Sequence, residues 1–325
     1  MRPPLSALLD SARVVSLPLA SRFRGITERE ALLFEGDEGW AEFSPFVEYP
    51  DAEAATWLAA AIDFAFRPTP PLLRDVIPVN ATLPAVGPAD VERVLARFGP
   101  CRTVKVKVAE RGQVLADDVE RVAAVRALLG PEGRVRIDAN GGWNVDEAEH
   151  ALRALSPYDI EYVEQPCASV EELADLRVRI RDLAIPIAAD ESVRKAEDPL
   201  AVARAGAADL LVVKAAPLGG VGPALRVVEE AGLPAVVSSA LDTSVGLSMG
   251  LHLAAALPRL DHDCGLGTSA LLLEDVTSPA LRPVDGAIEV RRVVPDEDAL
   301  ARNAATPERT GWWFERLERC YRLMA

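Results

Sequence analysis

The sequence predicts an α/β protein in which a parallel (β/α)-barrel follows a small α+β unit. The main observation is a repeat that begins near residue 76, where short Val/Ile-rich runs alternate with longer stretches rich in Ala, Leu, Arg and Glu. Such alternation is typical of parallel strands joined by crossover helices. The runs recur about every 25 residues, which suits a barrel near the usual size of about 250 residues. A doubly wound open sheet is the second choice, because no GxGxxG motif follows the first run.

The predicted barrel strands are short and rich in β-branched residues. They are VIPVNATL (76–83), RTVKVKV (102–108), RVRIDAN (134–140), IEYVEQP (160–166), IPIAADES (185–192), DLLVVKAA (209–216), AVVSSA (235–240) and LDHDCGLG (260–267). Helical stretches such as DDVERVAAVRALLG and VDEAEHALRAL separate them.

The chain before residue 76 has a different pattern. The runs ARVVSLPLA, EALLFEG and GWAEFSPF indicate antiparallel strands, and the helical stretch DAEAATWLAAAIDFAF follows them. We therefore expect residues 1–75 to form an α+β unit and residues 76–267 to form the barrel. Residues 268–325 supply no further βα unit, and we expect them to pack back on the first unit.

Composition excludes several classes of protein. The net charge of −15 argues against binding of nucleic acid, which requires basic patches. The four cysteines are widely spaced without a CxxC pair, so neither a zinc site nor a disulfide framework is expected. We find no signal peptide and no run long enough to span a membrane, and we expect a cytoplasmic protein. The sequence leaves the oligomeric state open.

Polar residues stand where the predicted strands end, which is where barrel enzymes place their chemistry. Asp138, with Asn140 two residues on, precedes Glu164 by 26 residues. Glu164 precedes Asp190 by 26 residues, and Asp190 precedes Lys214 by 24. Each interval is one βα repeat, so three carboxylates from adjacent strands should lie at the same height in the barrel.

Converging carboxylates repel one another, and a bound divalent cation relieves that repulsion. Oxygen-only ligands indicate Mg²⁺, or alternatively Mn²⁺, rather than zinc. A single acid after a strand is more often a helix N-cap, and a lysine such as Lys214 could extend its amine to solvent. Three caps in register, flanked by lysines on both outer strands, are a weaker explanation than a metal site.

The strand RTVKVKV carries two lysines on one face, because side chains two residues apart share a face. Lys105 and Lys107 would then flank the metal on one side and Lys214 on the other. A divalent ion on a substrate carboxylate can stabilise the enediolate that forms when an α-proton leaves. The cation and Lys105 should depress the pKa of Lys107, which would allow it to act as a base near neutral pH.

At this point the motifs KVKV, RIDANGGW, YVEQP, AADES and VVKAAPLGG resemble the enolase superfamily, in its muconate-lactonising subgroup. The resemblance covers most of the chain. It implies a (β/α)7β barrel with an N-terminal α+β capping domain. It also implies that Asp138, Glu164 and Asp190 bind Mg²⁺ and that Lys107 and Lys214 are the catalytic pair.

A narrower resemblance selects one activity within the subgroup. The stretches GWAEFSPFVEYPDAEAATWL, VVSSALDTSVGL and CGLGTSALLLEDV look like the actinobacterial o-succinylbenzoate synthase family. That family implies a lyase that dehydrates 2-succinyl-6-hydroxy-2,4-cyclohexadiene-1-carboxylate on the way to menaquinone. In that reaction Lys107 would remove the α-proton and return it to the departing hydroxyl. Lys214 would stabilise the enediolate ring system by a cation–π contact.

The same resemblance implies where a small carboxylate substrate would be held. Arg22 and Arg24 lie in the loop that would close over the site, although solvated loop arginines are an equal alternative. The expected substrate contacts are Asn140, Ser238, Ser239, Arg24 and the backbone of Gly265, Leu266 and Gly267.

Other functions stay open at this stage. Asp261 and Asp263 form an acid-x-acid motif like one that related dipeptide epimerases use to hold a substrate ammonium, but a structural role is favoured because the motif precedes the end of its strand. N-acylamino-acid racemisation is a further alternative, because the same lysine pair can serve both faces of an α-carbon. A catalytically silent barrel used as a binding protein would not need both lysines and all three acids.

Overall fold

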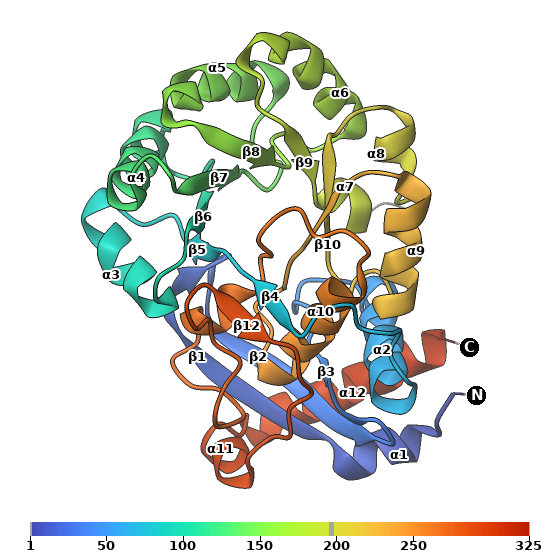
Figure 1. Cartoon of the computed structure of the whole chain (residues 1–325). Helices are drawn as coiled ribbons and strands as arrows, with labels where there is room; N and C mark the ends of the chain where they lie inside the picture. Colours follow the sequence, from blue (N-terminus) through green and yellow to red (C-terminus); the bar gives the residue numbers. More distant parts are fainter. Residues whose placement is uncertain (1, 195–197, 325) are drawn as a thin grey trace.

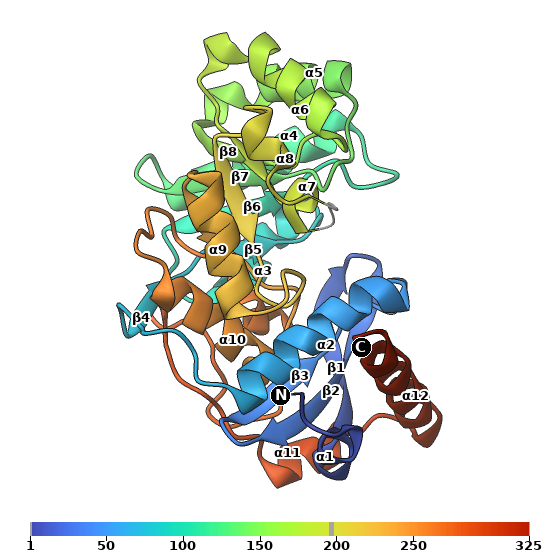
Figure 2. The ribbon, with the colours of Figure 1, turned by 90° about the vertical axis from the view of Figure 1, so that its right-hand side faces the viewer.

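Two main sheets, beside a two-stranded one, organise the described part of the chain, and Figures 1 and 2 show the barrel above the smaller of the main sheets. The computed structural model describes residues 2–194 and 198–324. The smaller sheet is antiparallel, and its strands follow the order β1 (Arg13–Phe23), β2 (Ile26–Gly36) and β3 (Gly39–Phe43). Helix α1 (Leu5–Ser11) precedes this sheet, and α2 (Asp51–Phe66) packs against it.

The larger sheet is parallel and curls into the barrel. Its strand order is β5 (Ala81–Leu83), β6 (Thr103–Lys107), β7 (Arg134–Asp138), β8 (Ile160–Glu164), β9 (Ile187–Ala189), β10 (Leu210–Val213) and β11 (Ala235–Val237). The connecting helices are α3 (Val91–Leu95), α4 (Leu115–Leu129), α5 (Val145–Leu155), α6 (Val170–Arg179), α7 (Glu191–Arg194), α8 (Ala201–Arg204) and α9 (Val221–Ala231). The sequence explains several helix starts, because Asn144 with Glu147 and Ser169 with Glu172 form capping boxes on α5 and α6.

The ring closes through an irregular segment and not through an eighth regular strand. The predicted strand at 260–267 is wrong as a continuous strand, because only short bridges form there: Cys264 with Val79 and Gly265 with Ser238. Its sequence, LDHDCGLG, is rich in charged residues and glycine, which form strands poorly. The bridges nevertheless join the chain ahead of β5 to β11, and so they complete the ring.

The predicted first strand at 76–83 is also divided. β4 (Val76–Pro78) pairs with β12 (Ala287–Glu289) outside the barrel, and only β5 enters the ring. The division follows Pro78, which lacks the backbone N–H that a continued ladder requires.

Alternate residues of each barrel strand face the interior. Apolar side chains from one side of the ring form a small interior cluster of Tyr162, Ala188, Leu210, Val212 and Val236. The other side is polar, because β6 and β7 present Thr103, Lys105, Lys107, Arg136 and Asp138 at their alternate positions. The charged side chains on this side of the barrel interior must therefore pair with one another.

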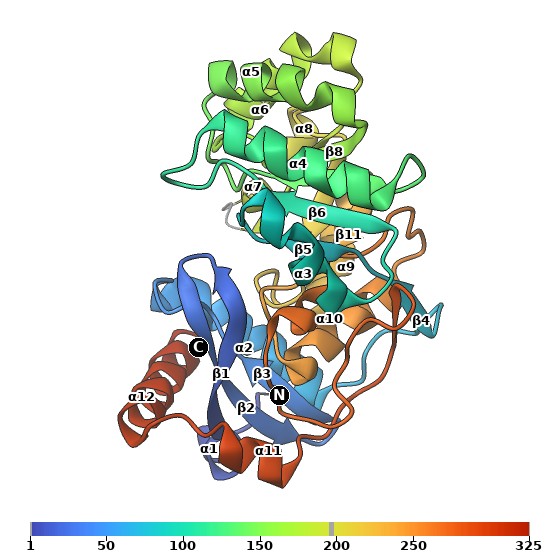
Figure 3. The same ribbon diagram turned by 90° about the vertical axis from the view of Figure 1, so that its left-hand side faces the viewer.

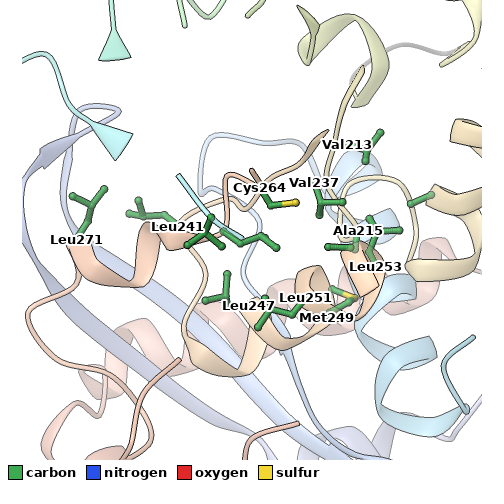
Figure 4. Close-up of a cluster of buried hydrophobic side chains, with 14 of the residues drawn as sticks. Val213, Ala215, Val237, Leu241, Leu247, Met249, Leu251, Leu253, Cys264 and Leu271 are labelled. Carbon is green, nitrogen blue, oxygen red and sulfur yellow. The ribbon is translucent and has the colours of Figure 1, made fainter. Parts of the chain in front are cut away.

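Helix α10 (Ser244–Ala256) connects the two parts of the molecule. Every residue of this helix is buried, because it packs on β11 and α9 as well as on β3 of the smaller sheet. Figure 4 shows Leu247, Met249, Leu251 and Leu253 of this helix beside Val237 and Cys264 of the closing wall. Gly246 is required at the contact with β3, since a Cβ atom there would lie 2.7 Å from Cδ of Glu42.

The C-terminal chain returns to the smaller sheet (Figure 3). Helix α11 (Glu297–Arg302) is followed by α12 (Pro307–Leu323), which contacts α2 and β1. Arg316 of α12, although 1% exposed, donates to the backbone oxygens of Phe46 and Tyr49. These hydrogen bonds fix the loop between β3 and α2 to helix α12.

The buried arginine of β7 gives a stability prediction. Arg136 is 0% exposed and donates to Glu161 Oε2 (2.5 Å), Asn80 Oδ1 (3.1 Å) and the carbonyl of Asp263 (2.5 Å). Arg136→Leu leaves these acceptors unpaired and should lower the free energy of unfolding by about 3–5 kcal/mol, measured by urea denaturation.

The matched control is Arg153→Leu, because Arg153 also pairs with two acids, Glu149 and Asp182, but its side chain is 43% exposed. Its loss should change the free energy of unfolding far less than the loss of Arg136, because exposed ion pairs contribute little to stability. Equal losses for the two variants would contradict the internal pairing of the barrel.

Candidate active site

A cavity lies between the C-terminal ends of the barrel strands and the smaller sheet. Its empty space, including the open mouth, is about 540 Å³. Of the residues that the sequence singles out, the cavity brings together Lys105, Lys107, Asp138, Asn140, Glu164, Asp190, Lys214, Ser238, Ser239 and Arg24.

Strand register sets the centre of this cavity. Lys107 pairs with Asp138 across β6 and β7, and Asp138 pairs with Glu164 across β7 and β8. Because neighbouring strands lie about 4.8 Å apart, the three side chains stand in a row at one level. Asp190 follows the end of β9 directly, and Lys214 follows the end of β10.

The lysines of β6 are bound to the carboxylates. Lys105 Nζ donates to both oxygens of Glu164, each at 2.9 Å, and lies 3.2 Å from Asp138 Oδ2. Lys107 Nζ donates to Asp138 Oδ2 and, at 2.7 Å, to Asn140 Oδ1. Lys105 and Lys107 carry like charges on one face of β6. These contacts compensate both charges, because each amine pairs with a carboxylate of its own.

The opposite side of the cavity repeats this pattern. Lys214 Nζ donates to Asp190 Oδ2, and Arg194 Nε donates to Asp190 Oδ1 at 2.9 Å. Both oxygens of this carboxylate therefore have a cationic partner. Arg194 is a site residue that the sequence analysis missed, although its position four residues after Asp190 on one helical turn is a readable signal.

The pKa values of the three carboxylates differ because their partners differ. Burial alone would raise the pKa of Asp138, but Lys107 and Lys105 hold it below its ordinary range. Burial would also raise the pKa of Asp190, but Arg194 and Lys214 outweigh this effect and hold that pKa below its ordinary range. At Glu164 burial and repulsion from Asp138 dominate over Lys105 and raise the pKa to about 7.

The lysines differ in the same way. Burial would lower the pKa of Lys105, but Glu164 and Asp138 outweigh it and raise that pKa above its ordinary value. At Lys214 burial is the larger effect, and the pKa lies below its ordinary value despite the attraction of Asp190. The two amines therefore differ in how readily they lose a proton.

The donor chemistry of this site fits a hard divalent cation. In the described residues, no three Asp, Glu, His or Cys side chains surround a single point, because lysine and arginine hold the carboxylates. However, Asp138, Glu164 and Asp190 are each 1% exposed and offer only oxygen donors from three adjacent strands. Burial and repulsion from Asp138 raise the pKa of Glu164, and a bound cation would favour its charged form.

The wall on the β11 side consists of hydroxyl groups. Ser239 Oγ donates to the carbonyl of Gly265 at 2.9 Å and lies 2.7 Å from Thr268 Oγ1. Ser238, Ser239 and Thr268 line the cavity, whereas the predicted contacts Gly265, Leu266 and Gly267 lie behind them. Those three residues are fully buried in the closing segment, so the structure does not bring them to the wall.

The smaller sheet supplies the roof of the cavity. Arg24 lies at the tip of the β1–β2 hairpin, with its guanidinium 4.3 Å from the ring centroid of Phe46, and donates to Tyr49 Oη at 3.3 Å. The neighbouring Phe23 ring lies 5.6 Å from Lys107 Nζ. Arg22 is exposed and does not line the cavity. Phe46, Tyr49 and Trp57 also line the roof, and sequence reasoning could not assign them because their contacts are long-range.

A buried acid joins the roof to the barrel. Glu42 of β3 accepts hydrogen bonds from the backbone nitrogens of Thr243 (3.0 Å) and Gly246 (3.1 Å), at the start of α10. Burial, followed by repulsion from Asp242, raises the pKa of Glu42 to about 7 although Arg29 lowers it. Arg29 itself donates to the carbonyl of Leu241, which lines the cavity.

The acid-x-acid motif lies at the other end of the barrel. Asp263 accepts hydrogen bonds from Arg102 (2.8 and 3.0 Å) and from Thr103 Oγ1 (2.5 Å), at the N-terminal end of β6. Asp261 pairs with the exposed Arg259. Neither acid lines the cavity, and both contacts are structural.

Comparison with known protein families matches both parts of the chain. A model described as "Enolase C-terminal domain-like" matches residues 88–297, and one described as "Enolase N-terminal domain-like" matches residues 14–65. The chain belongs to the enolase superfamily. Enzymes of this superfamily generally use Mg²⁺. The predicted fold class, a (β/α)7β barrel with an N-terminal α+β capping domain, is confirmed.

Curated relatives within the superfamily are similar over nearly their whole length. The o-succinylbenzoate synthase of Mycobacterium marinum is 57% identical over 98% of this chain and 96% of its own. That of Mycobacterium tuberculosis H37Rv is 57% identical over 99% and 97%. Among solved structures, the muconate lactonizing enzyme of Pseudomonas fluorescens has a TM-score of 0.78 and 22% identity, covering 91% of this chain and 98% of its own. At that identity the structural likeness shows the fold alone.

Within the described residues, no helix is long and apolar enough to cross a membrane.

Glu42 gives a pH-dependent prediction. Its folded pKa of about 7 lies above the ordinary carboxyl value of 4.5, so its proton stabilises the folded state. This stability is fully present below about pH 4.5 and is lost as the pH rises through about 7. In Glu42→Gln the decline in the free energy of unfolding between these pH values should be smaller by about 1–3 kcal/mol, measured by urea titration.

The control is Glu35→Gln, because Glu35 is an exposed carboxylate on the adjacent strand β2. This variant should keep the wild-type dependence on pH. An unchanged pH dependence in Glu42→Gln would show that Glu42 is ionised throughout this range.

Proposed function

We propose that this protein is an Mg²⁺-dependent o-succinylbenzoate synthase. It would dehydrate the dicarboxylate 2-succinyl-6-hydroxy-2,4-cyclohexadiene-1-carboxylate to 2-succinylbenzoate, a step toward menaquinone. The observation that carries the proposal is the register of β6, β7 and β8, which sets Lys107 beside Asp138 and Glu164 at one end of the barrel, with Lys214 at the same end on β10. The curated relatives at 57% identity support the choice of this activity within the superfamily.

Lys107 is the proposed base. Its Nζ, in the neutral form, takes the proton from the carbon that bears the ring carboxylate, and the electron pair becomes the enediolate. The same Nζ then gives the proton to the hydroxyl on the adjacent ring carbon, which leaves as water and completes the aromatic ring. Asn140 Oδ1, which accepts from Lys107 Nζ at 2.7 Å, orients this amine. Lys105 supports the site by holding both oxygens of Glu164.

Lys214 is the proposed partner on the opposite side of the substrate. Lys214 is 9% exposed and lines the cavity across from β6. A lysine ammonium in this position stabilises the negative charge of the enediolate ring by a cation–π contact. Asp190, which accepts from Lys214, keeps the amine in place.

Asp138, Glu164 and Asp190 would hold the cation. When bound, Mg²⁺ supplies positive charge at the carboxylate of the substrate, where negative charge develops in the reaction. These three carboxylates are also the partners of Lys105, Lys107 and Lys214, so the cation and the lysines compete for the same oxygens.

The remaining contacts would select the substrate. Ser238, Ser239 and Thr268 offer hydroxyl groups that could receive the succinyl carboxylate, and Arg24 offers a positive charge at the roof. Residues 1–75 would act as the cap over residues 76–267, with residues 268–325 as the segment that supports the cap. Among the residues that the structure describes, no contact favours the dipeptide epimerase, because the acid-x-acid motif lies at the far end of the barrel.

A substrate panel tests the activity. Purified protein, stripped with EDTA, is assayed with the cyclohexadiene substrate and with L-Ala-L-Glu, with and without MgCl₂. Dehydration should be lost on stripping and should return with Mg²⁺, because the clustered carboxylates require the cation. Rapid epimerisation of the dipeptide without dehydration of the diene would contradict the proposal.

The role of Lys107 is tested by substitution. Lys107→Ala removes the base and should lower kcat by about 10²–10⁴-fold, while the stabilisation of the fold by MgCl₂ persists in thermal melts. Arg111→Ala is the control, because it removes an exposed positive charge from the loop directly after β6. Unchanged activity in Lys107→Ala would favour a binding function for the barrel.

A further inference from the structure

In the described part of the chain, Arg194 is the one arginine at the ends of the barrel strands that is buried against a proposed metal ligand. It ends the short helix α7, and its side chain is 3% exposed. All three of its nitrogens have acceptors. Nε donates to Asp190 Oδ1 (2.9 Å), Nη2 to Glu191 Oε1 (2.6 Å) and Nη1 to Tyr49 Oη (3.3 Å). Three of the five N–H groups of the guanidinium thus have acceptors inside the protein, which fixes its orientation.

These contacts connect Arg194 both to a proposed cation ligand and to the proposed base. Through Asp190 Oδ1, Arg194 fixes one proposed cation ligand while leaving Oδ2 to Lys214. Through Glu191 Oε1, which also accepts from Asn140 Nδ2 at 3.3 Å, it connects to the residue that holds Lys107. One side chain thus sets the orientation of a ligand and of the contact that orients the base.

The third contact, with Tyr49, joins Arg194 to the capping unit, the N-terminal α+β part formed by residues 1–75. Tyr49 lies in the loop between β3 and α2, and its hydroxyl also accepts from Arg24 Nη2 at 3.3 Å. The ring of Tyr49 packs edge-on against Phe46 and Trp57, with centroids 5.5 and 6.2 Å away. Arg316 of α12 holds the backbone oxygen of Tyr49 at 2.6 Å. The hydroxyl therefore presents a fixed point to Arg194 from the other half of the molecule.

We propose that Arg194 is a positioning residue for the cation site and that Tyr49 makes the affinity of this site depend on the capping unit. The inference rests on the proposed function, because it requires that Asp190 binds the cation. It assigns to the capping unit a role in assembling the metal site, in addition to covering the substrate.

Charge and geometry make opposite predictions for Arg194. As a positive charge 2.9 Å from Asp190, it repels a cation, and its removal would then tighten binding. As a positioning group, it holds Asp190 and Glu191 in their orientation, and its removal would weaken binding. We expect geometry to dominate, because the charge of Arg194 is already neutralised by two carboxylates.

The test measures Mg²⁺ affinity without substrate or turnover. Wild type and variants are stripped with EDTA and titrated with MgCl₂ by isothermal calorimetry, with thermal melts to establish folding. Arg194→Met should weaken Mg²⁺ binding by about 10–100-fold. Arg194→Lys keeps the buried charge but not the fork of donors, and it should fall between Arg194→Met and wild type. Tyr49→Phe, which removes the hydroxyl that accepts from both Arg194 and Arg24, should weaken binding by about two- to tenfold.

Two controls match these variants. Arg153→Met removes a surface arginine that also has two acidic partners, and Tyr321→Phe removes a hydroxyl that donates to the carbonyl of Pro3, away from the cavity. Both should bind Mg²⁺ like wild type.

The outcomes separate this inference from the proposed function. Wild-type or tighter Mg²⁺ affinity in Arg194→Met and Arg194→Lys would overturn the positioning role, and wild-type affinity in Tyr49→Phe would overturn the link to the capping unit. If Arg194→Met does not fold, Arg194→Lys alone decides. If wild type itself binds no Mg²⁺, the proposed metal site falls and this inference falls with it.

Discussion

The pairing of buried charges at the mouth of the barrel is the constraint on which the rest of the structure depends. Lys105 is 6% exposed and would be too costly to bury alone, but the register of β6 to β8 gives it Glu164 and Asp138 as partners. That register in turn requires the parallel ladder and the one-repeat spacing of the strands. The fold and the candidate chemistry are therefore consequences of the same alternation along β6.

The capping unit is joined to the barrel by polar contacts that are themselves buried. Glu42 accepts from the start of α10, and Arg29 donates to the loop that lines the cavity. Burial makes such hydrogen bonds sensitive to the loss of either partner, because the remaining group would be left unpaired away from water. These hydrogen bonds thus hold the roof of the cavity in a fixed position relative to the strand ends.

Much of this arrangement could be predicted from the sequence, because strand ends and repeat spacing are local signals. Spacing alone predicts that four residues lie together, and the cavity contains all of them: Asp138, Glu164, Asp190 and Lys214. The division of the strand at Pro78 was missed because composition is continuous across it, and only the pairing with β12 reveals it. The role of Tyr49 in the roof could not be predicted, since Arg194, its partner in the barrel, lies more than a hundred residues away.

The charges of the site suggest why a cation and an acidic substrate belong together. Lys105, Lys107, Lys214 and Arg194 supply four positive charges, and Asp138, Glu164, Asp190 and Glu191 supply four negative ones, all joined by direct contacts. When Lys107 is in the neutral form that the proposed base requires, Arg24 at the roof of the cavity brings the number of positive charges back to four. This set is neutral, so a divalent ion alone would leave two positive charges in the cavity. A substrate with two carboxylates restores neutrality, whereas a neutral or cationic ligand does not. The balance of charge inside the protein thus agrees with the two negative charges of the proposed succinyl-cyclohexadiene carboxylate.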